Sequence, residues 1–126
     1  MLRFGDPPYL ECSSKGDKRF SAFYARIPWR NNKSIEELYQ FRKIILIDGQ
    51  YVSGLSPKEA KGKKPLNIED AHLFYSQLWR EYFECHPELL DIVRQYNGFS
   101  DMFGSSGSCC QAKEIYDIAM REKGKV

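Results

Sequence analysis

One helix constrains the fold of this chain more than any other segment. Over residues 68 to 84, apolar side chains recur at steps of three and four residues, so they form a continuous stripe on one helix face. Asn67 immediately precedes the stripe and is a good N-cap. The stripe needs a large apolar partner surface, and we expect this helix at the centre of the core. Its members are Ala71, Phe74, Tyr75, Leu78, Trp79, Tyr82 and Phe83.

The size of the chain limits the number of cores. With 126 residues, 42% of them hydrophobic, it can bury one core and is too short for two ordinary domains. We therefore expect one domain over residues 1–126. The net charge of +2 argues against binding to nucleic acid through bulk electrostatics, and it leaves a local basic patch open.

The hydropathy of the chain predicts its location, and the spacing of its cysteines indicates whether they bind metal. The chain has no long apolar run, and its beginning, MLRFGDPPYLEC, is unlike a signal peptide. We expect a cytoplasmic protein with no membrane partner. The cysteines fit neither a CxxC pair nor a zinc ligand set, so we expect reduced thiols, no metal and no cofactor. The minor alternative is a metal site formed by Cys85, His86, Cys109 and Cys110.

The first half of the chain predicts a small β-sheet or hairpins. Pro7 and Pro8 start the ordered part, and Asp48–Gly49 is a hairpin turn signal within KIILIDGQYV. The predicted elements are a strand at 9–14, a turn at 15–17, a strand at 19–27, a hairpin at 43–52 and a basic loop at 56–65.

Helical signals separate and follow these strands. Ser34 opens a helix of about ten residues, Pro87 is a first-turn residue, and Gly124 stops the last helix, which Ser108 caps. The predicted fold is α+β, a mainly helical single domain with a small N-terminal sheet. Its helices are the one that Ser34 opens, 68–84, 87–97 and 108–123.

Two adjacent glutamates in SIEELYQ have different predicted roles. Glu37 lies three residues after Ser34 and completes a capping box. Glu36 has no such role, and it shares a polar helix face with Gln40 four residues later. The alternative for Glu36 is a solvated acid in the first turn, which the helix dipole favours.

Three further segments contain candidate ligand contacts. The stretch FSDMFGSSGSCCQA, residues 99–112, joins Asp101 to a glycine- and serine-rich loop at a helix start, which suits a phosphate. The basic loop offers Lys61, and the predicted strand at 19–27 offers a cation, a hydroxyl and aromatic rings. The alternatives are an ordinary loop, solvated lysines and aromatic core residues, respectively.

In chain order, RFSAFY, SIEELYQ, AKGK, YSQLWREYFECHPELLDIV, DMFG and CQA resemble the NADAR family. Its members are N-glycosidases that act on ADP-ribose attached to guanine or, in a sister group, on phosphorylated riboflavin intermediates. The resemblance covers residues 19 to about 120 and extends to small proteins of T-even-type phages. It implies a NADAR-like fold and, for a phage-encoded chain, the host cytoplasm.

The resemblance also implies roles for individual residues. Glu36 matches the catalytic glutamate, and Asp101 is a second acid or a ligand of a ribose hydroxyl. No metal is needed for cleavage through an oxocarbenium-like sugar. Burial among Phe23, Tyr24 and Tyr39 would raise a carboxyl pKa there. The expected substrate contacts are Arg19, Ser21, Phe23, Tyr24, Gln40, Lys61, Phe103, Gly104, Ser106 and Gln111.

Departures from the family pattern motivate an alternative function. Ala22 stands where the family has asparagine, and Asp101 precedes Phe103–Gly104 where the family has a tryptophan–glycine pair. The alternative is an inactive binding protein that sequesters an ADP-ribose-containing ligand or engages a host protein. The expected partners are an ADP-ribose-like or other nucleotide ligand, a modified nucleic acid, or a host protein.

Overall fold

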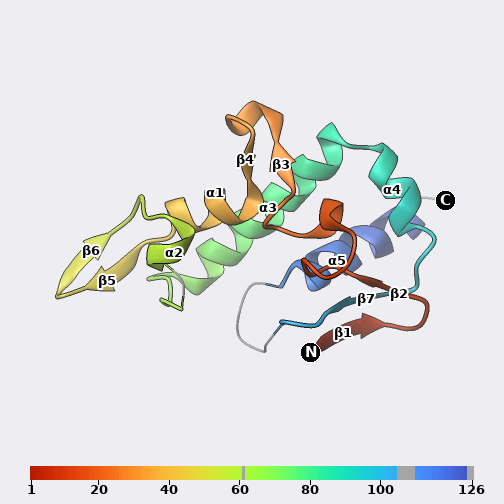
Figure 1. The fold of residues 1–126 in the computed structure, drawn as a ribbon, viewed down its shortest axis with the longest axis horizontal. Coiled ribbons are helices and arrows are strands. Elements are labelled where there is room, and N and C mark those ends of the chain that lie inside the picture. Colours follow the sequence, from red (N-terminus) through yellow and green to blue (C-terminus); the bar gives the residue numbers. More distant parts are fainter. Residues whose placement is uncertain (61, 105–109, 125–126) are drawn as a thin grey trace.

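The computed structural model describes residues 1–60, 62–104 and 110–124, and helix α3 (Ile68–Cys85) runs through its middle (Figure 1). The Asn67 side chain accepts a hydrogen bond from the Asp70 N–H, so the predicted N-cap is confirmed. All seven members of the predicted stripe are buried, and Leu78 and Trp79 are fully inaccessible. The prediction that this helix is the centre of the core is therefore confirmed.

A three-stranded sheet joins distant parts of the chain. Strand β7 (Gly98–Asp101) lies between β1 (Leu2–Gly5), which is antiparallel to it, and β2 (Tyr9–Glu11), which is parallel. All four residues of β7 are buried. A Cβ atom at Gly98 would lie 2.4 Å from the Tyr9 ring, so glycine is needed where these strands approach.

Only β2 of this sheet was predicted. The expectation that ordered structure starts at Pro7 is wrong, because β1 precedes it. The expectation of a helix over 87–97 followed by a loop is also wrong in part, because this helix, α4, ends at Val93 and strand β7 follows. Strands β1 and β7 are each only four residues long and contain a glycine, and β7, which is buried along its whole length, does not alternate between buried and exposed residues, so the strand signal is weak. Helix α4 spans Glu88–Val93.

Helix α5 (Gln111–Lys123) packs against β1 and β7 and contacts α3 and α4 (Figure 1). It buries Ala112, Ile115 and Ala119. Its N-cap is Cys110, so the helix begins three residues later than predicted. The predicted cap, Ser108, lies outside the described residues.

The segment predicted as a strand over residues 19–27 is not one. It contains the 3₁₀-helix η1 (Lys18–Phe20), a turn, and only two strand residues, β3 (Arg26–Ile27). Asp17 caps η1 by accepting the Arg19 N–H, and this local hydrogen bond competes with an extended backbone. Strand β3 pairs with β4 (Lys33–Ser34) across the second 3₁₀-helix, η2 (Pro28–Arg30).

Helix α1 (Ile35–Arg42) and a hairpin occupy the other end of the molecule (Figure 1). The predicted hairpin is confirmed: β5 (Ile45–Ile47) pairs with β6 (Gln50–Val52). Asp48 and Gly49 have φ angles of 50° and 78°, as a type I′ turn requires. Helix α2 (Pro57–Ala60) lies in the predicted basic loop, and Ser56 and Glu59 form a capping box there that the prediction missed.

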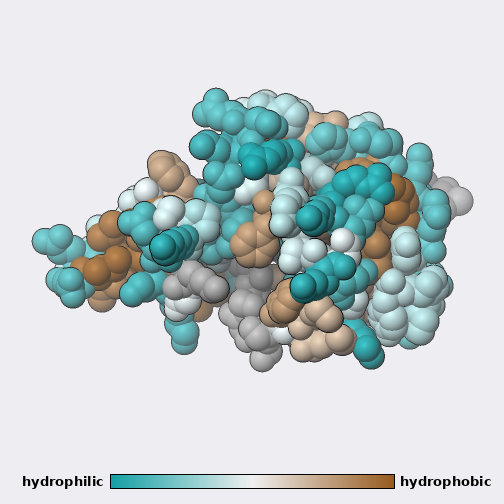
Figure 2. Space-filling model, in the orientation of Figure 1, coloured by the Kyte–Doolittle hydropathy of each residue, from teal (hydrophilic) through white to brown (hydrophobic). Residues whose placement is uncertain are grey.

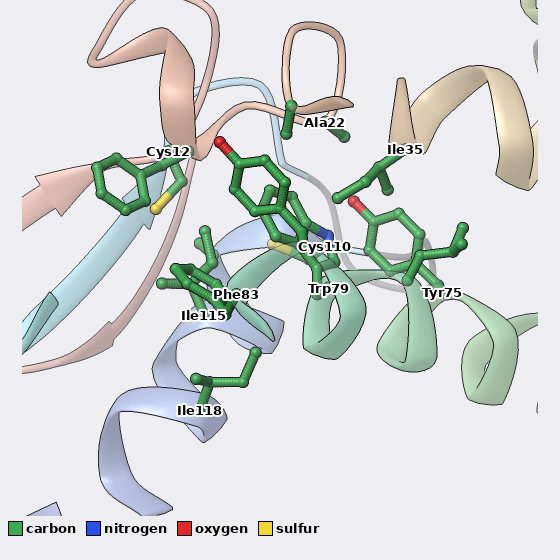
Figure 3. Packing of buried hydrophobic residues seen from close by; sticks show 14 of the residues in the cluster. Cys12, Ala22, Ile35, Tyr75, Trp79, Phe83, Cys110, Ile115 and Ile118 are labelled. Atoms are coloured by element: carbon green, nitrogen blue, oxygen red, sulfur yellow. The ribbon is translucent and has the colours of Figure 1, made fainter. Parts of the chain in front are cut away.

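Most of the buried hydrophobic residues form one cluster that connects the sheet, α5, α3 and the segment before α1 (Figure 3). The fold class is α+β, as predicted. Apolar side chains also reach the surface over the β5–β6 hairpin, at the left of Figure 2, where Leu46 is 60% exposed. Among the described residues, no helix combines the length and the hydropathy needed to cross a bilayer.

Candidate functional site

At the start of α1, the adjacent residues Glu36 and Glu37 make different hydrogen bonds. The Glu37 N–H donates to Ser34 Oγ at 3.1 Å, and the Ser34 N–H donates to Glu37 Oε1 at 3.2 Å. The predicted capping box is therefore confirmed. This hydrogen bond from the Ser34 N–H is the main reason that the pKa of the Glu37 carboxyl lies below its usual value. Glu37 is thus engaged in holding the helix start.

Glu36 lies on a different face of the same helix turn. Gln40 Nε2 donates to Glu36 Oε1 at 2.8 Å, which confirms the predicted pairing at a four-residue spacing. Gln40 is buried and Glu36 is half-buried. Glu36 Oε2 accepts no hydrogen bond from any residue that the structure describes. One oxygen of the carboxylate is therefore held by Gln40, and the other has no hydrogen-bond partner among these residues.

A chain of hydrogen bonds connects the backbone at Glu36 to Asp101. The Glu36 N–H donates to the Ala22 carbonyl at 3.0 Å, and the Ala22 N–H donates to Gln111 Oε1 at 2.6 Å. Gln111 Nε2 in turn donates to Asp101 Oδ2 at 3.0 Å. We call Ala22, Gln111 and Asp101 the Gln111 bridge. It joins the start of α1 to the start of α5 and the end of β7.

All three residues of the Gln111 bridge are buried, with 2 to 7% of their surface exposed. Asp101 Oδ1 also accepts a hydrogen bond from the Phe103 N–H at 3.0 Å, so each oxygen of this buried carboxylate has a donor. Burying a carboxylate is costly unless such donors replace water. The bridge therefore fixes the turn at residues 101–104 relative to α1.

Near the bridge, two buried polar atoms have no hydrogen-bond partner among the described residues: Ser21 Oγ and Trp79 Nε1. Figure 3 shows the Trp79 nitrogen on the side of the core where Ile35 and Cys110 lie. Ala22, which follows Ser21, lies across this part of the core from Trp79 (Figure 3). Buried groups of this kind are usually satisfied, so an additional acceptor next to either atom would be stabilising.

Cysteines near the bridge are poor nucleophiles. Burial is the main cause that raises the pKa of both the Cys12 and the Cys110 thiol above its ordinary value. Both are free thiols. Among the described residues, no group of three or more His, Cys, Asp and Glu side chains could hold a metal ion.

The aromatic residues predicted around Glu36 differ in burial. Phe23 and Tyr24 are 59% and 49% exposed, so the expected aromatic enclosure of Glu36 by these two rings is wrong; the turn that replaces the predicted strand directs them outward. Tyr39 is buried, as expected. The Arg19 guanidinium pairs with Asp17 at 2.6 Å.

The remaining predicted contacts differ in burial, and two of them lie outside the described residues. Ser21 is fully buried in the cluster beside Ala22. Phe103 is 63% exposed and lies in the turn that Asp101 holds, together with Gly104. Lys61 and Ser106 lie outside the described residues, so the predicted phosphate contacts at these positions stay predictions.

Lys43 is the residue that the sequence interpretation missed. Its side chain is buried, and Nζ lies 3.4 Å from Gln40 Oε1 and 3.3 Å from the Ala60 carbonyl oxygen. The available signal was spacing: Lys43 follows Gln40 by three residues and Tyr39 by four, which places it beside both on a helix surface.

A groove lies on another face of α1. It has a volume of about 600 Å³ and lies between α1, the loop after β6 and η2. Leu38 and Phe41 contribute apolar surface to it, and Glu36 and Gln111 do not line it. The Glu36–Gln40 pair, which the backbone of Glu36 connects to the Gln111 bridge, is thus separate from this groove. No protein-family model matches the chain, and no curated protein matches it either.

Proposed function

We propose that the protein is an N-glycosidase that hydrolyses the bond between ribose and the base in an ADP-ribosylated base, or in a related nucleotide or riboflavin intermediate. The observation that carries the proposal is the geometry of Glu36, whose Oε1 is held by Gln40 while Oε2 accepts no hydrogen bond from the described residues. The resemblance of SIEELYQ to the NADAR motif assigns catalysis to this same glutamate.

A carboxylate held in this way suits cleavage of an N-glycosidic bond. As the bond between the anomeric carbon and nitrogen breaks, its electron pair leaves with the base and the sugar acquires oxocarbenium character. The negative charge of Glu36 stabilises that cationic sugar. Water adds to the anomeric carbon, Glu36 Oε2 takes its proton, and the proton is returned to the leaving base.

Neighbouring residues have supporting roles in this proposal. Gln40 orients Glu36, and Gln111 fixes the backbone on which Glu36 begins the helix. Asp101 is assigned to positioning, because its two oxygens hold Gln111 and the turn at Phe103. The start of α5 supplies N–H groups and a positive dipole end for the diphosphate of the ligand.

The chain offers a matched pair of variants for testing this role. Glu36→Gln and Glu37→Gln change adjacent residues in the same way, but glutamine still functions in a capping box. Wild type and both variants are incubated with ADP-ribosylated guanine, other ADP-ribosyl conjugates, NAD and riboflavin intermediates, and released base is measured by mass spectrometry. We expect Glu36→Gln to reduce turnover by about 100- to 10,000-fold and Glu37→Gln to reduce it little. Equal turnover in wild type and Glu36→Gln would refute the role of Glu36.

A second function is favoured by Ala22. The family asparagine at this position would supply a side-chain amide, whereas Ala22 contributes only its backbone, which the Gln111 bridge already uses. A protein that binds an ADP-ribose-containing ligand without turning it over fits this loss. Recovery of intact ligand in complex with both wild type and Glu36→Gln, with no product from either, would favour this second function.

A further inference from the structure

Lys43 places a cation inside the protein directly behind the Glu36–Gln40 pair. It is the C-cap of α1, and only 9% of its surface is exposed. Besides its contacts with Gln40 and Ala60, its ammonium lies 5.9 Å from the centre of the Tyr39 ring. Burying an ammonium is unfavourable unless hydrogen-bond acceptors replace the water that it loses. The Gln40 and Ala60 oxygens therefore have to stay close to Lys43 Nζ.

The ammonium of Lys43 and the carboxylate of Glu36 favour the same orientation of the Gln40 amide. An ammonium only donates hydrogen bonds, and an ionised carboxylate only accepts them. Gln40 Oε1 therefore faces Lys43, and Nε2 faces Glu36. In the reversed amide, the NH₂ group would face the ammonium and the carbonyl oxygen would face the carboxylate. Both contacts would be repulsive.

We infer that Lys43 is a positioning residue, which acts on Glu36 through Gln40. With Lys43 in place, Gln40 presents a donor to Glu36 Oε1 and leaves Oε2 to the ligand. The consequence for turnover rests on the proposed N-glycosidase function, whereas the orientation of Gln40 does not. The adjacent Arg42 is a matched control, because its guanidinium pairs with Asp70 at 3.6 Å and stacks on Phe74 at 4.3 Å instead.

The first test measures the amide itself. In ¹⁵N-labelled protein, the Gln40 side-chain NH₂ signal is assigned by its disappearance in Gln40→Met, and its hydrogen exchange with water is compared among variants. We expect Lys43→Met to increase this exchange by about 10-fold and Arg42→Met to leave it unchanged, because Lys43 contacts the amide oxygen whereas Arg42 contacts Asp70 and Phe74. Lys43→Arg retains a cationic donor and keeps exchange within about 3-fold of wild type, which also provides a folded variant if Lys43→Met does not fold. Unchanged exchange in Lys43→Met, or loss of protection in Lys43→Arg, overturns the inference.

The second test is a double-mutant cycle on turnover. If Lys43 acts through Gln40, Lys43→Met lowers kcat with little change in KM, and it has no further effect once Gln40→Met is present. Equal effects of Lys43→Met in both backgrounds would overturn the inference. If wild type turns over no substrate, the proposed function fails, and the amide measurement still decides the role of Lys43.

Discussion

Replacing Gln111 with methionine tests the Gln111 bridge, because methionine keeps the length of the side chain and removes both of its hydrogen-bonding groups. The Ala22 N–H loses an acceptor at 2.6 Å, and Asp101 Oδ2 loses a donor at 3.0 Å. Both partners stay buried, and each unsatisfied group costs about 1–3 kcal/mol. Burial of the apolar methionine side chain offsets a part of this loss in free energy. We therefore expect the free energy of unfolding to fall by about 3 kcal/mol.

The assay is urea unfolding at pH 7 followed by circular dichroism. A loss of about 3 kcal/mol corresponds to a decrease in Tm of about 10 °C for a chain of this size, so a thermal scan gives a second readout. Gln95→Met is the control, because Gln95 is exposed and its side chain donates to the Asp91 carbonyl at the protein surface. A loss below about 1 kcal/mol for Gln111→Met, or an equal loss in the control, would show that the two hydrogen bonds are not buried as described.

Two further outcomes follow from side chains around α1 and α3. Ser34→Ala removes the N-cap oxygen, and we expect it to lower the free energy of unfolding by about 1 kcal/mol in urea unfolding, whereas no loss would contradict the capping role. The Arg30 guanidinium, which donates to Glu81 at 2.7 Å, is the main cause that lowers the pKa of Glu81 to about 2. A carboxyl whose pKa is lowered by folding stabilises the fold at pH values above its pKa in the unfolded chain, which is about 4.3 for glutamate. This contribution is lost as the pH falls towards 2. In acid titrations, Glu81→Gln should therefore lose less stability than wild type between about pH 4.3 and 2, and an identical acid profile would refute the assignment.

Signals within a few residues predicted the elements that form locally. Asn67 and the stripe of α3, the Ser34–Glu37 capping box and the Asp48–Gly49 turn all combine residues that are close in sequence, and all three are present. Local hydrogen bonds and helical spacing determine such elements. The Glu36–Gln40 pair was predictable for the same reason.

Features that depend on distant partners were not predictable in this way. Strand β7 acquires its extended conformation from β1 and β2, which the residues of β7 do not reveal. The segment at 19–27 has alternating side chains, yet Asp17 and the contacts with α1 hold it in turns. The Gln111 bridge joins residues 89 positions apart, and no spacing rule connects them. Asp101 was identified as a candidate, but its partner Gln111 was identified only as a ligand contact.

The position of β7 between two N-terminal strands has a consequence for how the protein assembles. Leu2 pairs with Asp101, and Leu10 pairs with Phe99, so the sheet closes a loop of most of the chain. Contacts between residues this far apart in sequence form late and slowly, because the chain loses the entropy of loop closure before these contacts stabilise the fold. Glu36 and Gln40, on one helix, can meet early. Their connection to Asp101 is completed only when the two ends of the chain have come together, so a local opening at the sheet would uncouple the two carboxylates while leaving α1 intact.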